Sequence, residues 1–424
     1  MEKFNPSVNP DTVIFNLFMP KRDFLRRWLV AVFAVETLCI TYALKFPGLA
    51  TVNSVLYFCC GITVAILFLF LPQIQRPAFD FPNRSRTYLK AFLIIATGIL
   101  IFYFVYSIIQ DSPIDYRNAD MLPVIRKMNE RFLDGKWAQV YDSIPEIWNG
   151  SKPVYLPGIW LPFAPAVALH MDLRWVTATS LLVVCTLPFL LVRLTQKSTL
   201  VLLIAAALLW WLLSENDTHG FISFSEEGVV VLYYCLLAIA LATGNIYYIS
   251  IAASLCMLSR YALIGWMPAF FTFLLLNRKY KQALLFSLTP LFFFLFFFIV
   301  PFGWKAFLHL MQLPSYYIDF SKRVWKDSPE TFSDYIGFAK FFVPGKMRLL
   351  HTLLIGLSFI IPTGFILFCN YYKSKINLSN IALAALKISM VVFYNFIDVP
   401  YLYLFYSSTF VSFTAVVFFL QDEY

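Results

Sequence analysis

The chain has 424 residues, of which 60% are hydrophobic and only 13% are charged, and its mean hydropathy is +0.71. This composition excludes an ordinary soluble domain, whose apolar content is nearer half, and it predicts an all-α protein that crosses a membrane many times. The formal net charge of +9 is explained by cationic loops beside membrane helices and by contacts with lipid phosphates, so we expect no nucleic-acid partner.

About twelve apolar stretches are long enough, or nearly long enough, to cross a bilayer as helices. They cover residues 28–44, 54–71, 91–109, 175–192, 199–213, 229–242, 246–258, 261–276, 283–301, 349–368, 381–397 and 401–420. The stretches between 229 and 276 are the shortest. Because one helical membrane domain can use a whole chain, we treat residues 1–424 as a single integral membrane domain.

Lysine and arginine residues fill the short connections on one side of this arrangement. They are Lys21, Arg22, Arg26, Arg27, Arg76, Arg84, Arg86, Lys90, Arg193, Lys197, Arg278, Lys279, Lys281, Lys373 and Lys375. By the positive-inside rule this side is cytoplasmic, and so are both termini. The long segments 111–174 and 302–348 and the short acidic connection 214–227 then lie outside, as in a multi-pass protein of a bacterial inner membrane.

Acidic residues are concentrated in the first long external segment, 111–174. It holds about a third of the 24 carboxylates of the chain: Asp111, Asp115, Asp120, Glu130, Asp134, Asp142, Glu146 and Asp172. The chain leaves the membrane after residue 109 and reaches Asp115 and Asp120 almost at once. We therefore expect the chemistry of the protein in this segment, at the boundary between water and lipid.

An amphipathic helix is predicted after Pro123, because apolar residues then recur at helical spacing up to Gly135. Such a helix is suited to lying on the membrane surface. Asp120 stands just before it, where a capping carboxylate is favoured, so a helix cap is the alternative interpretation of Asp120. Further on, the four prolines of 152–165 prevent a normal spanning helix, and we expect that segment to re-enter against the protein.

These features resemble the GT-C superfamily of membrane glycosyltransferases, and in particular its bacterial branch, mannosyltransferases included, that uses polyprenyl-phosphate sugars. The matching residues are Asp120 soon after a membrane exit, Gly135 after a short helix, then Tyr141 and Tyr155-Leu-Pro157. Where the family commonly has Gly-x-x-Pro-Tyr, this chain has Gly135-Lys-Trp-Ala-Gln-Val-Tyr141. The motifs match only over about 110–165, whereas the topology is similar along much of the chain.

The resemblance implies an inverting transfer of a monosaccharide from a polyprenyl-phosphate donor to a lipid-linked glycan or glycolipid on the extracytoplasmic side, without a soluble cofactor. An aspartate of the external loop is the general base of that family. Asp120 is the first choice for this role because of its spacing to Gly135, and Asp115 is the second. A partly desolvated carboxylate suits the role, since its pKa rises toward the working pH.

Arg260 is the leading candidate to hold the leaving phosphate, because it interrupts two apolar runs that should meet at the external side. Contact with lipid phosphates is the alternative. Arg117 ranks below it, as does Arg174. Further candidates to bind substrate are Tyr155, Glu226, Glu227 and His219. A solvated helix start explains the two glutamates equally well.

The spacing of cysteines and histidines predicts no metal site. All seven cysteines lie in or at the end of predicted spans, and the four histidines, at 170, 219, 309 and 351, have no ligand spacing. A divalent cation held by Asp115 and Asp120 remains a weaker hypothesis. Glu36 and Lys387, each inside a predicted span, are functional candidates by default.

Two other classes of protein stay open at this point. A transporter or flippase of a lipid-linked saccharide would show inverted repeats and ionisable groups at the midplane, whereas this chain shows no repeat and carries most of its charge in loops. A glycan ligase or a non-catalytic assembly subunit would use the same external segments differently. The aromatic residues of 302–348 fit interfacial anchoring or acceptor recognition.

Overall fold

The computed structural model describes residues 22–70, 84–114, 121–147, 150, 152–191, 196–214, 220–311, 313–371 and 378–419, which form helices and no β-sheet. Four of the candidate residues lie outside these ranges, namely Asp115, Arg117, Asp120 and His219. Five of the fifteen cationic residues expected in the cytoplasm also lie outside them, namely Lys21, Arg76, Arg193, Lys373 and Lys375.

Six helices in the described part of the chain are long and apolar enough to cross a membrane: Pro47–Phe70, Thr87–Asp111, Arg174–Leu191, Tyr280–Met311, Met347–Tyr371 and Leu378–Asn395. Shorter apolar helices cover Leu203–Ser214, Glu227–Thr243, Ile246–Met257, Tyr261–Leu276 and Leu402–Val417. All twelve predicted stretches thus fall on helices, the remaining one on α2 (Arg22–Thr41). A helical multi-pass membrane protein is confirmed, and the count of twelve crossings stays a prediction.

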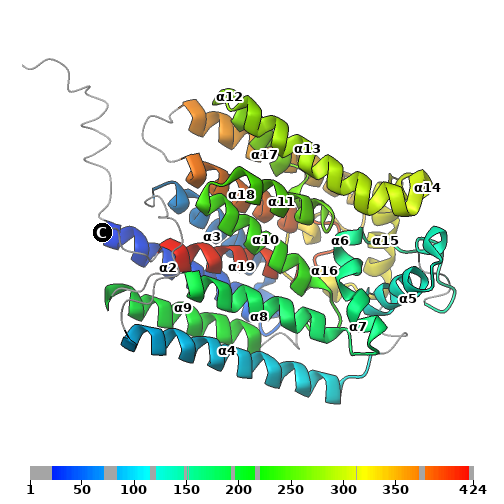
Figure 1. The fold of residues 1–424 in the computed structure, drawn as a ribbon, viewed down its shortest axis with the longest axis horizontal. Helices are drawn as coiled ribbons and strands as arrows, with labels where there is room; N and C mark the ends of the chain where they lie inside the picture. The colour runs from blue at the N-terminus through cyan, green and yellow to red at the C-terminus, as the bar shows by residue number, and fades with distance from the viewer. Residues whose placement is uncertain are drawn as a thin grey trace, which may run out of the picture.

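The apolar helices lie alongside one another and run from left to right across Figure 1. They are α2, α3 (Ala50–Phe70), α4 (Arg84–Asp111), α8 (Arg174–Leu191), α9 (Gln196–Ser214), α10 (Glu227–Thr243), α11 (Ile246–Met257), α12 (Trp266–Leu276), α13 (Tyr280–Phe294), α14 (Val300–Met311), α17 (Met347–Tyr371), α18 (Leu378–Asn395) and α19 (Leu402–Phe419). The centre of the bundle is formed by α18 and α19, whose described side chains are almost all buried.

The two long segments predicted outside the membrane lie together at the right-hand end of the bundle in Figure 1. The first contributes α5 (Met121–Leu133), α6 (Pro157–Trp160) and α7 (Ala164–Ala168), and the second contributes α15 (Leu313–Asp327) and α16 (Glu330–Ser333). They touch where the ring of Phe302 packs against Tyr141 and Trp160, with centroids 5.5 Å apart in both pairs. His309 Nε2 also lies 3.3 Å from the carbonyl oxygen of Pro153.

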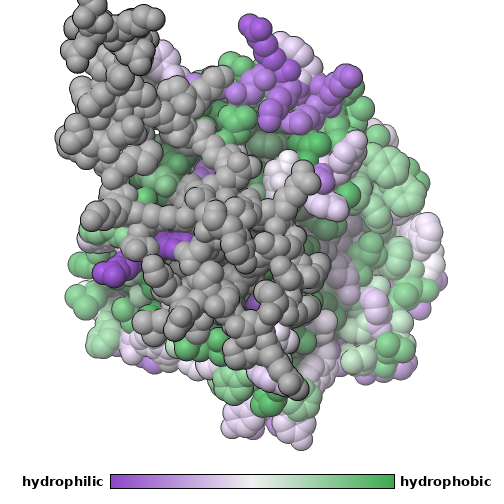
Figure 2. All heavy atoms as spheres, turned by 60° about the vertical axis from the view of Figure 1, so that its left-hand side comes forward, coloured by the Kyte–Doolittle hydropathy of each residue, from purple (hydrophilic) through white to green (hydrophobic). Residues whose placement is uncertain are grey.

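The opposite end carries the start of α2, the end of α19 and the connection from α12 to α13 (Figure 1). Figure 2 brings this end forward, with hydrophilic residues gathered along the upper edge and mostly apolar residues on the flanks. The start of α2 and the end of α19 share one end of the bundle, and both long segments share the other, as the predicted alternation of helices requires (Figure 1).

The predicted amphipathic helix is α5, and Gly135 follows it with a φ of +76°. Its apolar residues Leu122, Val124, Ile125 and Met128 are buried, because α5 packs on α6, α7 and the turn between them. The helix therefore covers its apolar face with protein, and the expectation that this face lies on the membrane surface is wrong. The proline-rich segment after it packs against the protein as predicted, since Ile159, Trp160 and Phe163 are buried.

Candidate functional site

Arg260 forms ion pairs with two glutamates at the end of the bundle where the long segments lie. Its Nη2 donates to Glu226 Oε1 at 2.6 Å and to Glu227 Oε2 at 2.7 Å. Arg260 follows α11, whereas Glu226 precedes α10 and Glu227 is its first residue. A third element joins them, since Ser407 Oγ of α19 donates to Glu227 Oε1 at 2.7 Å. We call these four residues the Arg260 cluster.

The charges of the Arg260 cluster do not cancel. Both glutamate side chains are fully buried and the arginine side chain is 20% exposed, so two carboxylates share one guanidinium. Buried charges are tolerated only when they are paired and hydrogen-bonded. The two buried carboxylates would therefore be stabilised by one further positive charge, by a proton on one of them, or by additional hydrogen-bond donors.

Several buried polar atoms around the cluster have no hydrogen-bond partner among the described residues. They are Glu226 Oε2, Arg260 Nε and the hydroxyls of Tyr234 and Tyr261. Proteins pair nearly all of their buried polar groups, and an unpaired one costs about 1–3 kcal/mol. Such a concentration of unpaired donors and acceptors is typical of a site that water or a polar ligand completes.

Two aromatic side chains connect the Arg260 cluster to the external segments. Tyr317 of α15 lies within electrostatic reach of Arg260, Glu226 and Asp398; its burial raises its pKa to about 12, and Arg260 limits the rise. Tyr403 of α19 lies within electrostatic reach of Arg260, and its hydroxyl donates to the sulfur of Met121 at 3.1 Å. Met121 is the first residue of α5 and follows Asp120 in the sequence.

Tyr155 belongs to the packing of the segment beside the cluster. Its carbonyl oxygen accepts a hydrogen bond of 3.1 Å from the Tyr141 hydroxyl. Three residues later the N–H of Gly158 donates to the carbonyl oxygen of Leu258 at 2.8 Å. A Cβ at Gly158 would lie 2.7 Å from that same oxygen, so glycine permits the approach. This contact fixes the segment to the chain two residues before Arg260.

Arg174, ranked below Arg260 for phosphate binding, is a buried clamp. It donates to both carboxylate oxygens of Asp172, at 2.9 and 2.7 Å, and to the carbonyl oxygens of Ile108 and Ser112. Burial opposes ionisation of Asp172, but the hydrogen bonds from Arg174 outweigh it and lower the pKa of this carboxyl. The clamp ties the start of α8 to the end of α4, directly before the segment that carries Asp115.

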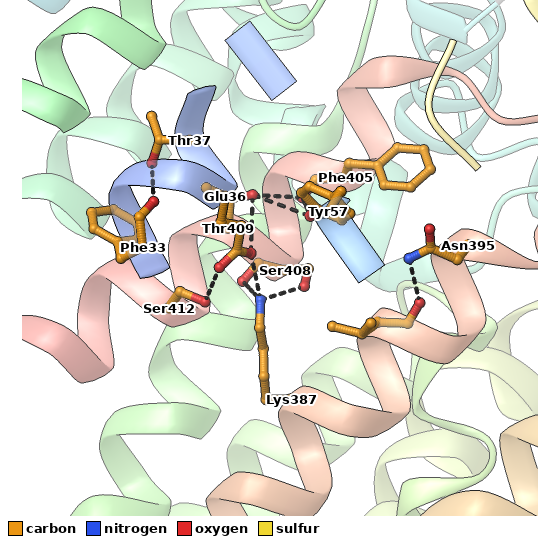
Figure 3. Close-up of polar contacts among 11 residues, drawn as sticks. Phe33, Glu36, Thr37, Tyr57, Lys387, Asn395, Phe405, Ser408, Thr409 and Ser412 are labelled. Atoms are coloured by element: carbon orange, nitrogen blue, oxygen red, sulfur yellow. Dashed lines mark hydrogen bonds and ion pairs between the residues drawn. The ribbon is translucent and has the colours of Figure 1, made fainter. Parts of the chain in front are cut away.

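Glu36 and Lys387, which the sequence offers as two separate candidates, are partners. Lys387 Nζ donates to Glu36 Oε1 at 2.6 Å and to the carbonyl and hydroxyl oxygens of Ser408 at 2.8 and 2.7 Å (Figure 3). Glu36 also accepts from Ser412 Oγ at 2.8 Å. Two opposite charges within predicted spans are a signal for such a pair, because lipid offers neither of them a partner.

No group of three or more histidine, cysteine, aspartate or glutamate side chains that could hold a metal ion occurs among the residues for which the structure gives positions. Searches against protein-family models, curated proteins and solved structures gave no match. The fold and the apolar helices define the class of the protein, which is a helical, multi-pass integral membrane protein.

Proposed function

We propose that this protein is an inverting membrane glycosyltransferase of the GT-C type, which moves a monosaccharide from a polyprenyl phosphate to a lipid-linked glycan or glycolipid. One contact carries the proposal. The hydrogen bond from Tyr403 to Met121 holds the residue after Asp120 against α19, one helical turn from Ser407 of the Arg260 cluster. An acidic external segment and a polar site with unpaired atoms thus adjoin each other.

In the proposed reaction an acceptor hydroxyl oxygen forms a bond to the anomeric carbon of the sugar. The bond from that carbon to the phosphate oxygen breaks, and the polyprenyl phosphate leaves with the electron pair. Asp120 accepts the hydroxyl proton, with Asp115 as the second choice for this role. Proton transfer to a positioned base contributes roughly 10²–10⁴-fold to such reactions.

Within this proposal Glu226 and Glu227 accept hydrogen bonds from sugar hydroxyls, and Glu226 Oε2 is unpaired for that purpose. Arg260 can hold the leaving phosphate, its expected role, only if the charge of the two neighbouring glutamates is reduced or moved away. A phosphate beside two ionised carboxylates is repelled, so it binds Arg260 only when a carboxylate is protonated or releases the guanidinium. Otherwise Arg260 serves to orient the two glutamates.

The test is transfer from a radiolabelled polyprenyl-phosphate sugar by the purified full chain in lipid. Glu226→Gln keeps the size of the side chain and removes its charge, and we expect transfer to fall at least tenfold, the effect of losing about 1.4 kcal/mol of transition-state stabilisation. Glu146→Gln is the matched control, because Glu146 is an exposed glutamate of the first external segment, and it should transfer as the wild type does. A folded wild-type protein that transfers no sugar from any such donor contradicts the proposal.

A second candidate function is transport of a lipid-linked saccharide across the membrane, and the Glu36–Lys387 pair favours it. Both side chains are fully buried within the bundle, and ionisable groups at such depth often belong to substrate or proton pathways. Flux of a fluorescent lipid-linked saccharide in proteoliposomes tests this function. A transporter should show flux that the double variant Glu36→Leu/Lys387→Met abolishes while it stays folded, because no buried charge is left without a partner, whereas a glycosyltransferase should show none.

A further inference from the structure

A second polar pair lies at the same end of the bundle, outside the Arg260 cluster. His351 is in the first two turns of α17, and Asp398 is in the turn between α18 and α19. Their atoms Nδ1 and Oδ2 are 2.6 Å apart, and the two side chains are only 13% and 9% exposed. Their chain neighbours Leu350 and Val399 belong to one small apolar cluster, which fixes the two backbones relative to each other.

Asp398 determines which nitrogen of His351 has a lone pair. A carboxylate accepts hydrogen bonds and donates none, so the short contact requires a proton on Nδ1. In a neutral imidazole the other nitrogen, Nε2, then carries the lone pair and is an acceptor. When the ring is neutral, the hydrogen bond thus leaves His351 as an acceptor at Nε2, with the ring held by its buried partner; a protonated ring carries hydrogen on both nitrogens and accepts at neither.

Nε2 of His351 is buried and has no hydrogen-bond partner among the described residues. An acceptor prepared in this way and left unpaired costs free energy unless a donor reaches it. The nearest link to the candidate site is Tyr317, which lies within electrostatic reach of both Asp398 and Arg260. The pair lies at the same end of the bundle as the Arg260 cluster, since Asp398 precedes α19 by four residues and Ser407 of the cluster is in the second turn of α19.

We propose that His351, oriented by Asp398, is a substrate-binding residue whose Nε2 accepts a hydrogen bond from a hydroxyl group of a bound saccharide. A hydroxyl matches the site, because it donates one hydrogen bond and carries no charge that the buried carboxylates would repel. A phosphate offers acceptors only and does not match Nε2. The identity of the saccharide rests on the proposed function. The tautomer of His351 does not depend on the proposed function.

The experiment compares the wild type with Asp398→Asn and His351→Phe, each as the full chain in lipid. Nitrogen-15 spectra of histidine-labelled protein report the tautomer, and the His351 signals are those missing from His351→Phe. We expect a proton on Nδ1 in the wild type. In Asp398→Asn the amide can donate to Nδ1 through its NH2 as well as accept from it through its oxygen, so the tautomer is no longer fixed and part of the population should carry its proton on Nε2. A structural role would tolerate this change, because both side chains keep their size and their hydrogen bond.

The second readout is the apparent KM for a polyprenyl-phosphate sugar, taken as polyprenyl-phosphate mannose. Asp398→Asn and His351→Phe should each raise it roughly tenfold, the effect of one buried hydrogen bond, with a smaller change in kcat. His170→Asn is the control: His170 is exposed and has a φ of +53°, which asparagine tolerates. It should leave KM unchanged.

The outcomes separate the two proposals. A wild-type protein with its proton on Nε2 overturns the role of His351, whether or not transfer occurs. The role of His351 is also overturned if Asp398→Asn changes the tautomer, or His351→Phe removes the imidazole, and the KM stays the same. If the wild type transfers no sugar, the proposed function fails, and the role of His351 is then decided by whether added polyprenyl-phosphate mannose shifts the Nε2 signal.

Discussion

Lys387 Nζ lies 2.6 Å from Glu36 Oε1 in the interior of the helix bundle, and neither side chain is exposed. Lys387 is in the middle of α18 and Glu36 is in α2, so the pair joins two helices far apart in the sequence. Ser408, Thr409 and Ser412 of α19 supply the remaining hydrogen bonds. The pair is therefore fully satisfied, and it fixes α19 between α2 and α18.

Removal of one member of this pair should destabilise the protein strongly. Lys387→Met leaves Glu36 as an uncompensated buried charge, which costs about 3–5 kcal/mol in comparable sites. The double variant Glu36→Leu/Lys387→Met should be much closer to the wild type, because no charge is left behind. Thermal unfolding in detergent measures both effects. If the stability loss of the double variant equals the sum of the losses of Glu36→Leu and Lys387→Met, the two residues are not energetically coupled.

Gly158 should be essential to the geometry beside Arg260. An added methyl group at this position would lie 2.7 Å from the carbonyl oxygen of Leu258, which is too close for contact, so Gly158→Ala should push the segment away from the end of α11. We expect a loss of transfer activity larger than the loss of thermal stability. Gly356→Ala is the control, because its added methyl group meets nothing within 4 Å.

The sequence was sufficient for the helices and for the sides of the bundle. Apolar length located the six helices long enough to cross a membrane, the helical period located α5, and Gly135 marked its end. The sequence did not predict whether the apolar face of a given helix is covered by protein or by lipid. The apolar side of α5 meets α6 and α7, because Pro157 and the prolines after it fold that segment back, and lipid is therefore not needed to cover it.

The contacts of the candidate site were not predictable because they join residues far apart in the chain. Arg260 is separated by 34 positions from Glu226, and His351 by 47 from Asp398. Each residue could be placed at the external end by topology alone, but which of them meet depends on how α10, α11, α17 and α19 pack. Glu36 and Lys387 illustrate the same point at a separation of 351 positions.

The clamp between Asp172 and Arg174 should make the external end sensitive to acid. The pKa of Asp172 is lowered in the folded protein from its ordinary value of 3.8. Its contribution to stability is therefore complete above that value and is lost as the pH falls through the lowered pKa. Limited proteolysis of the external end in acid should show this loss. Asp172→Asn should be cut more readily at neutral pH and should show a weaker dependence on acid.

Asp120→Asn is expected to abolish glycosyl transfer while leaving folding and donor binding intact. Asparagine keeps the size of the side chain and caps a helix as well as aspartate does, so the start of α5 and its contact with Tyr403 should survive. It cannot take a proton as a carboxylate does, and loss of a general base costs roughly 10²–10⁴-fold in rate. Asp115→Asn should have a milder effect. Transfer is measured from a radiolabelled polyprenyl-phosphate sugar at matched expression, and near-wild-type turnover by Asp120→Asn would reduce Asp120 to a helix cap and give the role of base to Asp115.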